Sequence, residues 1–135
     1  MVGILLVTHA PLGKAFVAAC AHVFRGPTER LEAIDVTADQ DLVEVQGLAD
    51  QAILRLDDGS GVLVITDVKG GTPANCCNKL AAAGRVEVIA GISLPMLLRA
   101  ITYRRDTLDV VVEMALAGAQ SGAVRVDNRI RVGPN

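Results

Sequence analysis

Short apolar runs alternate with longer segments of helical periodicity along this sequence. The predicted strands span residues 2–7, 31–36, 62–66 and 86–90, and a segment with a helical pattern follows each of them. The first run is apolar throughout, which is typical of a strand that is covered on both faces of a parallel sheet. We therefore predict an α/β fold, with a doubly wound four-stranded parallel sheet and helices on both of its faces.

Turn and capping residues bound the predicted helices. Pro11 suits the first turn of a helix that Gly26 and Pro27 terminate. The segment from Thr37 to Gln40 has the form of a capping box and precedes a regular apolar stripe at residues 42–56. Three further helices are expected at residues 73–84, from 93 to about 103, and from 108 to about 122.

The C-terminal residues show the alternation of a strand. Val124, Val126, Ile130 and Val132 share one parity, and charged residues occupy most of the other. A last strand is therefore predicted, or a small hairpin that turns at residues 127–128. Exchange of this strand with a second subunit would cover its apolar face and pair a sheet edge, and packing on its own subunit is the alternative. We predict one domain at residues 1–122, with residues 123–135 as its C-terminal strand and tail.

Composition excludes several classes of protein. The chain has 135 residues, of which 51% are hydrophobic and 21% charged, and this argues against disorder. A formal charge of −2 provides no overall basic excess to attract nucleic acid or an anionic membrane, and leaves a local basic patch as the alternative. The longest uncharged run, residues 1–13, is too short to span a bilayer.

The three cysteines indicate a reducing compartment. Cys20, Cys76 and Cys77 are odd in number and form no Cys-x-x-Cys spacing, so we interpret them as reduced thiols and small apolar residues of a cytoplasmic protein. No cluster of His or Cys with metal-ligand spacing is present in the sequence, so we predict no metal and no cofactor.

Candidate functional residues follow the predicted strands, since the carboxyl ends of parallel strands build the site in such folds. The segments concerned are Thr8-His9, Thr37-Ala38, residues 67–73 and residues 91–95. In the strand order 2-1-3-4, which we predict, His9 and Asp67 end neighbouring strands. An aspartate that accepts a bond from Nδ1–H leaves Nε2 free, so His9 is a candidate nucleophile or general base.

Structural roles are the alternative for these residues. A histidine at a strand end is often structural, and Asp67 could be a loop or helix cap. We expect His22, inside the first helix, to be a structural or surface residue.

The turn Gly70-Gly71-Thr72-Pro73 precedes a predicted helix. Two glycines allow close approach of the backbone to a ligand, and N–H groups at a helix start favour an anion. Glycines before a helix are common, so this motif alone is weak evidence. No Walker motif, Gly-x-Gly-x-x-Gly or Gly-x-Ser-x-Gly accompanies it. Together with His9 and Asp67, the turn predicts a phosphohistidine site, with phosphoryl oxygens near Gly71 and Thr72.

Three motifs resemble enzyme IIA of the mannose class of the bacterial phosphotransferase system. They are the strand ending in Thr8-His9, the segment Asp67-Val-Lys-Gly-Gly-Thr-Pro-Ala-Asn75, and the segment Val88-Ile-Ala-Gly-Ile-Ser-Leu-Pro-Met96. Their order and separations match over residues 2–122. Lys69 departs from the pattern, because many members carry an apolar or aromatic residue there. It either attracts an anionic partner or is a solvated loop lysine.

The resemblance implies a phosphocarrier activity. His9 would take a phosphoryl group from HPr, which phosphoenolpyruvate charges through enzyme I, and would pass it to a IIB domain in sugar uptake. Asp67 would pair with the histidine, and Thr72 would be the hydroxyl near the phosphate. The family is dimeric, with an antiparallel strand exchanged between subunits.

Two other hypotheses remain open. No IIB sequence follows in this chain, so we expect a free IIA protein, and its phosphorylation could instead serve regulation without a dedicated transporter. An unrelated α/β domain that binds a small molecule at the same edge is the third hypothesis.

Overall fold

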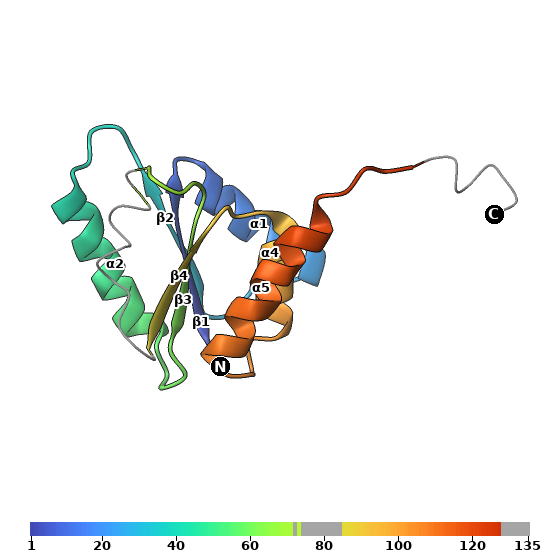
Figure 1. Ribbon diagram of the computed structural model, residues 1–135. Coiled ribbons are helices and arrows are strands. Elements are labelled where there is room, and N and C mark those ends of the chain that lie inside the picture. The colour runs from blue at the N-terminus through green and yellow to red at the C-terminus, as the bar shows by residue number, and fades with distance from the viewer. Residues whose placement is uncertain (72, 74–84, 128–135) are drawn as a thin grey trace, which may run out of the picture.

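Four parallel strands form the centre of the molecule. The structure is a computed structural model, and it describes residues 1–71, 73 and 85–127. The strands lie side by side in the order β2-β1-β3-β4 (Figure 1). They are β1 (Gly3–His9), β2 (Leu31–Val36), β3 (Val62–Thr66) and β4 (Val86–Ala90). The predicted parallel α/β sheet and its order 2-1-3-4 are therefore confirmed.

Helices cover both faces of this sheet. The helices α1 (Leu12–Phe24), α4 (Leu94–Thr102) and α5 (Leu108–Gly122) pack on one face, and α2 (Leu42–Leu56) packs on the other (Figure 1). Apart from Pro73, the helix predicted at residues 73–84 lies outside the described residues. Among the helices that the structure describes, none has both the length and the apolar character to cross a membrane.

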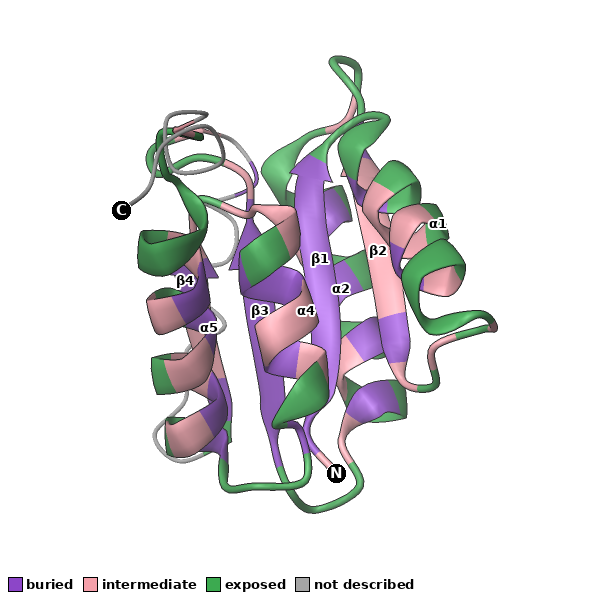
Figure 2. Ribbon diagram, turned by 90° about the vertical axis from the view of Figure 1, so that its right-hand side faces the viewer, coloured by how far each residue is buried: buried purple, intermediate pink, exposed green. Residues whose placement is uncertain are grey.

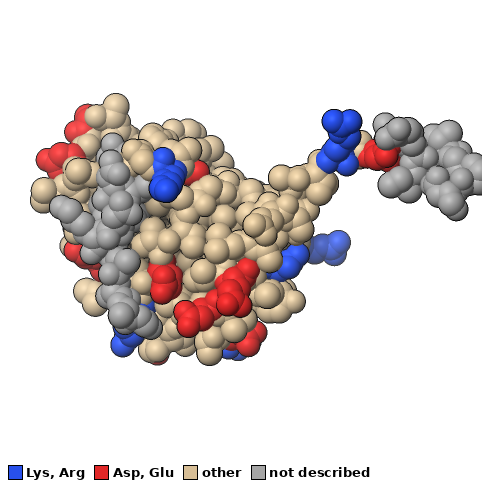
Figure 3. Space-filling model, in the orientation of Figure 1, with Lys and Arg blue, Asp and Glu red and all other residues tan. Residues whose placement is uncertain are grey.

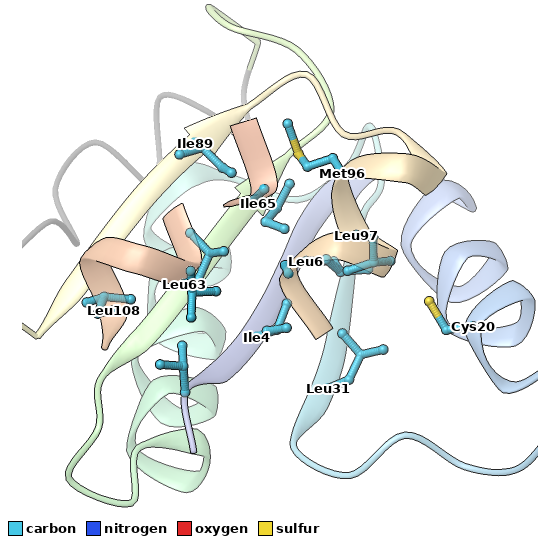
Figure 4. Packing of buried hydrophobic residues seen from close by; sticks show 14 residues of the cluster. Ile4, Leu6, Cys20, Leu31, Leu63, Ile65, Ile89, Met96, Leu97 and Leu108 are labelled. Carbon is cyan, nitrogen blue, oxygen red and sulfur yellow. The ribbon is translucent and has the colours of Figure 1, made fainter. Parts of the chain in front are cut away.

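Alternation along β1 divides the hydrophobic core into two clusters. Ile4 and Leu6 belong to the cluster beneath α1, α4 and α5 (Figure 4), whereas Leu5 and Val7 belong to the cluster beneath α2. Successive side chains of a strand point to opposite faces, so a central strand with helices on both faces must be apolar throughout. Figure 2 shows β1 buried over almost its whole length. Burial thus explains the apolar run that predicted the strand.

Side chains cap the starts of α4 and α2, and the cap of α2 differs from the predicted one. The Ser93 hydroxyl accepts a hydrogen bond from the Met96 N–H at the start of α4. At α2 the N-cap is Asp41, whose carboxylate accepts from the Glu44 N–H at 2.8 Å, and the predicted cap at Thr37 is wrong. The Gln40 side chain still accepts from the Thr37 N–H at 3.0 Å, so residues 37–40 form a turn of their own ahead of the helix.

The chain leaves the body of the molecule after α5. Figure 1 shows this segment pointing away from the sheet, and Val124 and Val126 are 69% and 79% exposed. Residues 124–127 form no strand within one chain. The remainder of the predicted strand at residues 124–132 lies outside the described residues, so its exchange between subunits stays a prediction.

Candidate active site

His9 is the last residue of β1 and lies at the carboxyl edge of the sheet. The sequence predicted His9 at the end of this strand, and pairing with β2 continues through His9, which lies opposite Val36. The side chain of His9 is 53% exposed, in contrast to the fully buried Thr8 before it. The buried strand therefore fixes the backbone of a histidine whose ring is accessible to a partner.

Asp67 follows β3 directly and lies behind the His9 ring. Its Oδ2 is 2.8 Å from the imidazole Nδ1 and accepts a second hydrogen bond from the His9 backbone N–H at 3.0 Å. Oδ1 of the same carboxylate accepts from the Val68 N–H at 3.0 Å. Strands β1 and β3 are neighbours, with Val7 opposite Thr66, and this places the two side chains together.

The electrostatics of this pair favour an ionised carboxylate. Burial by itself would raise the pKa of Asp67, but the hydrogen bonds from the His9 backbone and ring outweigh burial and lower it below its ordinary value. An ionised Asp67 accepts the Nδ1–H bond, so the proton stays on Nδ1 and the lone pair on Nε2. Nε2 is then the ring nitrogen that carries the free lone pair.

Gly71, in the loop after β3, borders the Cε1–Nε2 edge of the His9 ring. A Cβ added at Gly71 would lie 3.1 Å from Cε1 of His9 and 3.7 Å from Nε2. Gly70 has a φ of +89°, a conformation that L side chains rarely adopt. Thr72, the third residue predicted to bind phosphate, lies outside the described residues. The structure thus brings His9, Asp67 and Gly71 together at one edge.

The loop between β2 and α2 forms another wall of the site. A cleft of about 500 Å³ adjoins His9. The residues that line it are His9, Ala10, Val36, Thr37, Ala38 and Gln40. Thr37 and Ala38 were expected near the site from their place after β2. Gln40 was not, because its position depends on the turn at residues 37–40.

Asp35, which the sequence did not predict as a site residue, lies inside β2 beside Thr8. Its carboxylate accepts hydrogen bonds from the N–H of Gly13 at 2.9 Å and of Lys14 at 3.4 Å. These N–H groups belong to the first turn of α1, where an anion would otherwise be favoured. An acidic residue within an apolar strand is the sequence signal that could have identified Asp35.

The remaining charged groups are dispersed. His22 lies in the last turn of α1, at the far end of that helix from His9, and Lys69 is exposed in the β3 loop. On the face of the molecule that Figure 3 shows, the described residues form no broad basic patch. Across those residues, no group of three or more His, Cys, Asp and Glu side chains is placed to hold a metal ion.

The fold and the site define an open α/β domain with an accessible histidine at a strand end, backed by a carboxylate. The model of the EIIA-man family, described as the PTS system fructose IIA component, matches residues 3–116. The chain therefore belongs to this family, the mannose-class IIA components of the phosphotransferase system.

Curated relatives agree with this assignment. The mannose-specific EIIAB component of Escherichia coli K12 is 26% identical over 124 residues, which are 90% of this chain and 38% of that protein. The fructose-specific EIIA component of Bacillus subtilis is 26% identical over 105 residues, 77% of this chain and 71% of that protein. The chain thus spans little more than a third of the mannose-specific relative.

A solved structure shares the fold. The phosphotransferase system component EIIA from Streptococcus agalactiae superposes with a TM-score of 0.83 at 24% identity, over 93% of this chain and 97% of that one. At this identity the likeness concerns the fold alone.

Proposed function

We propose that the protein is a phosphocarrier, which accepts a phosphoryl group from phospho-HPr on Nε2 of His9 and passes it to a IIB protein during sugar uptake. The observation that carries the proposal is the contact of 2.8 Å between His9 Nδ1 and Asp67 Oδ2 beneath an exposed ring. Family membership supports it, because the matched region includes both residues.

The chemistry is a nucleophilic transfer in two steps. The Nε2 lone pair attacks the phosphorus of the donor, a P–N bond forms, and the bond to the donor breaks with its electron pair. The nucleophile of the IIB acceptor then attacks the same phosphorus, and the electron pair of the P–N bond returns to Nε2. The proton on Nδ1 stays in place throughout.

Asp67 has two tasks in this proposal. Its hydrogen bond holds the proton on Nδ1, and its negative charge stabilises the positive charge that develops on the ring as the P–N bond forms. Because Asp67 also accepts from the His9 backbone N–H, the ring and the carboxylate move together as a unit.

The backbone around Gly70 and Gly71 would receive the phosphoryl oxygens. Gly71 lies beside Nε2 and has no side chain to obstruct a tetrahedral group. The Thr72 hydroxyl is proposed as a further donor. Residues 1–122 would form this carrier domain, and residues 123–135 would pair with a second subunit of a cytoplasmic homodimer.

Incubation with phosphoenolpyruvate, enzyme I and HPr tests the proposal, with intact-mass analysis as the readout. We expect a gain of one phosphoryl group, lost again on addition of a IIB acceptor. Omission of HPr is the control and should leave the mass unchanged. No gain of mass in the complete mixture would refute the carrier function.

Transfer to IIB separates this function from its alternative. A protein that reports phosphorylation state through binding would still be phosphorylated by HPr. It would retain the group in the presence of the IIB proteins encoded in the same genome.

A further inference from the structure

We propose that Asp35 is a positioning residue, which holds the segment around His9 in the geometry required for phosphoryl transfer. The inference rests on the proposed function and extends it to a residue outside the His9–Asp67 pair. It starts from the hydrogen bonds that one carboxylate makes on both sides of His9.

Asp35 joins the residue before His9 to the helix after it. Its Oδ1 accepts from the Thr8 hydroxyl at 3.3 Å and from the Gly13 N–H at 2.9 Å, and its Oδ2 accepts from the Lys14 N–H at 3.4 Å. Residues 9–12 lie between these anchor points. The carboxylate therefore fixes both ends of the segment that carries the nucleophile.

The end of β1 is held from both neighbouring strands. From β3, Asp67 contacts the ring and backbone of His9. From β2, Asp35 contacts Thr8, its partner in the strand register, and the Val36 carbonyl accepts from the Ala10 N–H at 3.0 Å. Asp67 fixes the rotation of the imidazole about the side-chain bonds of His9. Asp35 fixes the position of the backbone from which that side chain extends.

Gly13 leaves room for this contact. A Cβ at Gly13 would lie 2.6 Å from Asp35 Oδ1 and 3.0 Å from both the Thr8 hydroxyl and the Ala33 Cβ. Any larger residue would push the carboxylate away from the start of α1. The contact thus needs a glycine on α1, a threonine on β1 and an aspartate on β2 at the same place.

The same carboxylate occupies N–H groups that would attract an anion. With Asp35 bonded to the N–H groups of Gly13 and Lys14, the first turn of α1 already faces a negative charge. Asp35 therefore leaves neither of these N–H groups free for a phosphoryl group.

The variants Asp35→Ala and Thr8→Val test the inference, with Asp41→Ala as a matched control. Asp41 is also an aspartate that caps a helix, and it accepts from the Glu44 N–H at 2.8 Å. It does not line the cleft at His9. Circular dichroism and thermal unfolding establish that each variant is folded at the assay temperature.

Transfer from phospho-HPr and the NMR signals of the His9 imidazole are then measured. We expect the maximal rate to fall by about tenfold or more in Asp35→Ala, since small misplacements of a reacting group are costly. The KM for phospho-HPr should change by less than about twofold, because the docking surface is retained. In Asp41→Ala the rate should stay within about twofold of wild type. The ring signals should shift in Asp35→Ala and stay unchanged in Asp41→Ala.

Thr8→Val keeps the shape of the buried residue and removes one hydrogen bond, so it covers the case in which Asp35→Ala does not fold. We expect a fall of about threefold in rate and a shift of the ring signals. Wild-type rate and unchanged ring signals in a folded Asp35 variant, or in Thr8→Val, overturn the inference.

Failure of the carrier function can be distinguished from failure of the positioning role of Asp35. If the wild-type protein takes no phosphoryl group, the carrier function is wrong, and the imidazole signals alone decide the positioning. A shift in Asp35→Ala without one in Asp41→Ala supports it, and unchanged signals in both overturn it.

Discussion

Oδ2 of Asp67 contacts His9 twice, accepting from its backbone N–H at 3.0 Å and lying 2.8 Å from Nδ1 of its ring. A carboxylate that holds the backbone and the side chain of one residue leaves that ring little freedom to rotate. The free nitrogen, Nε2, is thereby directed toward solvent and toward Gly71. Preorganisation of this kind lowers the cost of reaching the transition state.

Phosphorylation is expected on His9 alone. His9→Ala should abolish labelling from phospho-HPr, because no other residue presents an imidazole backed by a carboxylate in the described part of the chain. His22→Ala is the matched control, because His22 lies in the last turn of α1, and it should leave labelling unchanged. The product should be acid-labile, as expected of a P–N bond. Labelling that persists in His9→Ala would falsify the assignment.

Asp67→Asn should slow transfer without disrupting the fold. The amide removes the charge that stabilises a cationic ring, and its NH2 group favours the wrong tautomer when it faces Nδ1. Loss of a charge-assisted hydrogen bond of about 1.5–3 kcal/mol corresponds to about ten- to a hundredfold in rate. Rapid-quench kinetics with phospho-HPr measure this. A rate equal to that of wild type would remove Asp67 from the mechanism.

The contribution of Asp67 to stability should depend on pH. Its pKa is lowered below the ordinary value of 3.8, so the folded state binds the proton less tightly than the unfolded state does. The resulting stabilisation is fully present above about pH 5 and declines as pH falls through the folded pKa. Urea unfolding of wild type and Asp67→Asn at about pH 7 and about pH 3 measures the effect. The difference in unfolding free energy between the two proteins should be smaller at the lower pH. A constant difference would contradict the prediction.

Gly71→Ala should impair transfer with little loss of stability. The added Cβ would lie 3.1 Å from Cε1 of His9 and 3.2 Å from the Val68 side chain, so the ring or the loop must shift by a few tenths of an ångström. We expect a fall in maximal rate of about tenfold, with a change in unfolding free energy within about 1 kcal/mol. Gly47→Ala is the control, because no atom lies within 4 Å of a Cβ at Gly47. Equal rates for both variants would show that Gly71 does not border the phosphoryl group.

The C-terminal segment is expected to contribute to a homodimer interface. Val124 and Val126 are 69% and 79% exposed beside the end of α5, and a second subunit would cover them. Truncation after Gly122 should convert the dimer to monomers in analytical ultracentrifugation. Arg125→Ala, on the opposite parity, is the control and should remain dimeric. A truncated protein that sediments as the same dimer would exclude the exchanged strand.

Local patterns determined most of the architecture and part of the site. An uninterrupted apolar strand is stable only between two helical layers, so the β1 run by itself indicated a central parallel strand. Polar residues directly after such strands necessarily gather at one sheet edge, which is why His9 and Asp67 could be associated from the sequence. Because successive side chains of a strand point to opposite faces, Ile4 and Leu5 lie in different core clusters.

Tertiary structure decided the features that depend on partners distant in the chain. Hydrogen bonding to β2 extends β1 through His9, two residues beyond its apolar run. The N-cap of α2 is Asp41 and not Thr37, because the Gln40 side chain accepts a hydrogen bond from the Thr37 N–H in a separate turn. Asp35 reaches the Gly13 N–H across 22 residues only because β2 lies beside β1 and Gly13 has no side chain. Periodicity in the sequence indicates whether a residue is buried. A hydrogen bond of that residue depends also on where the rest of the chain places the bonding partner.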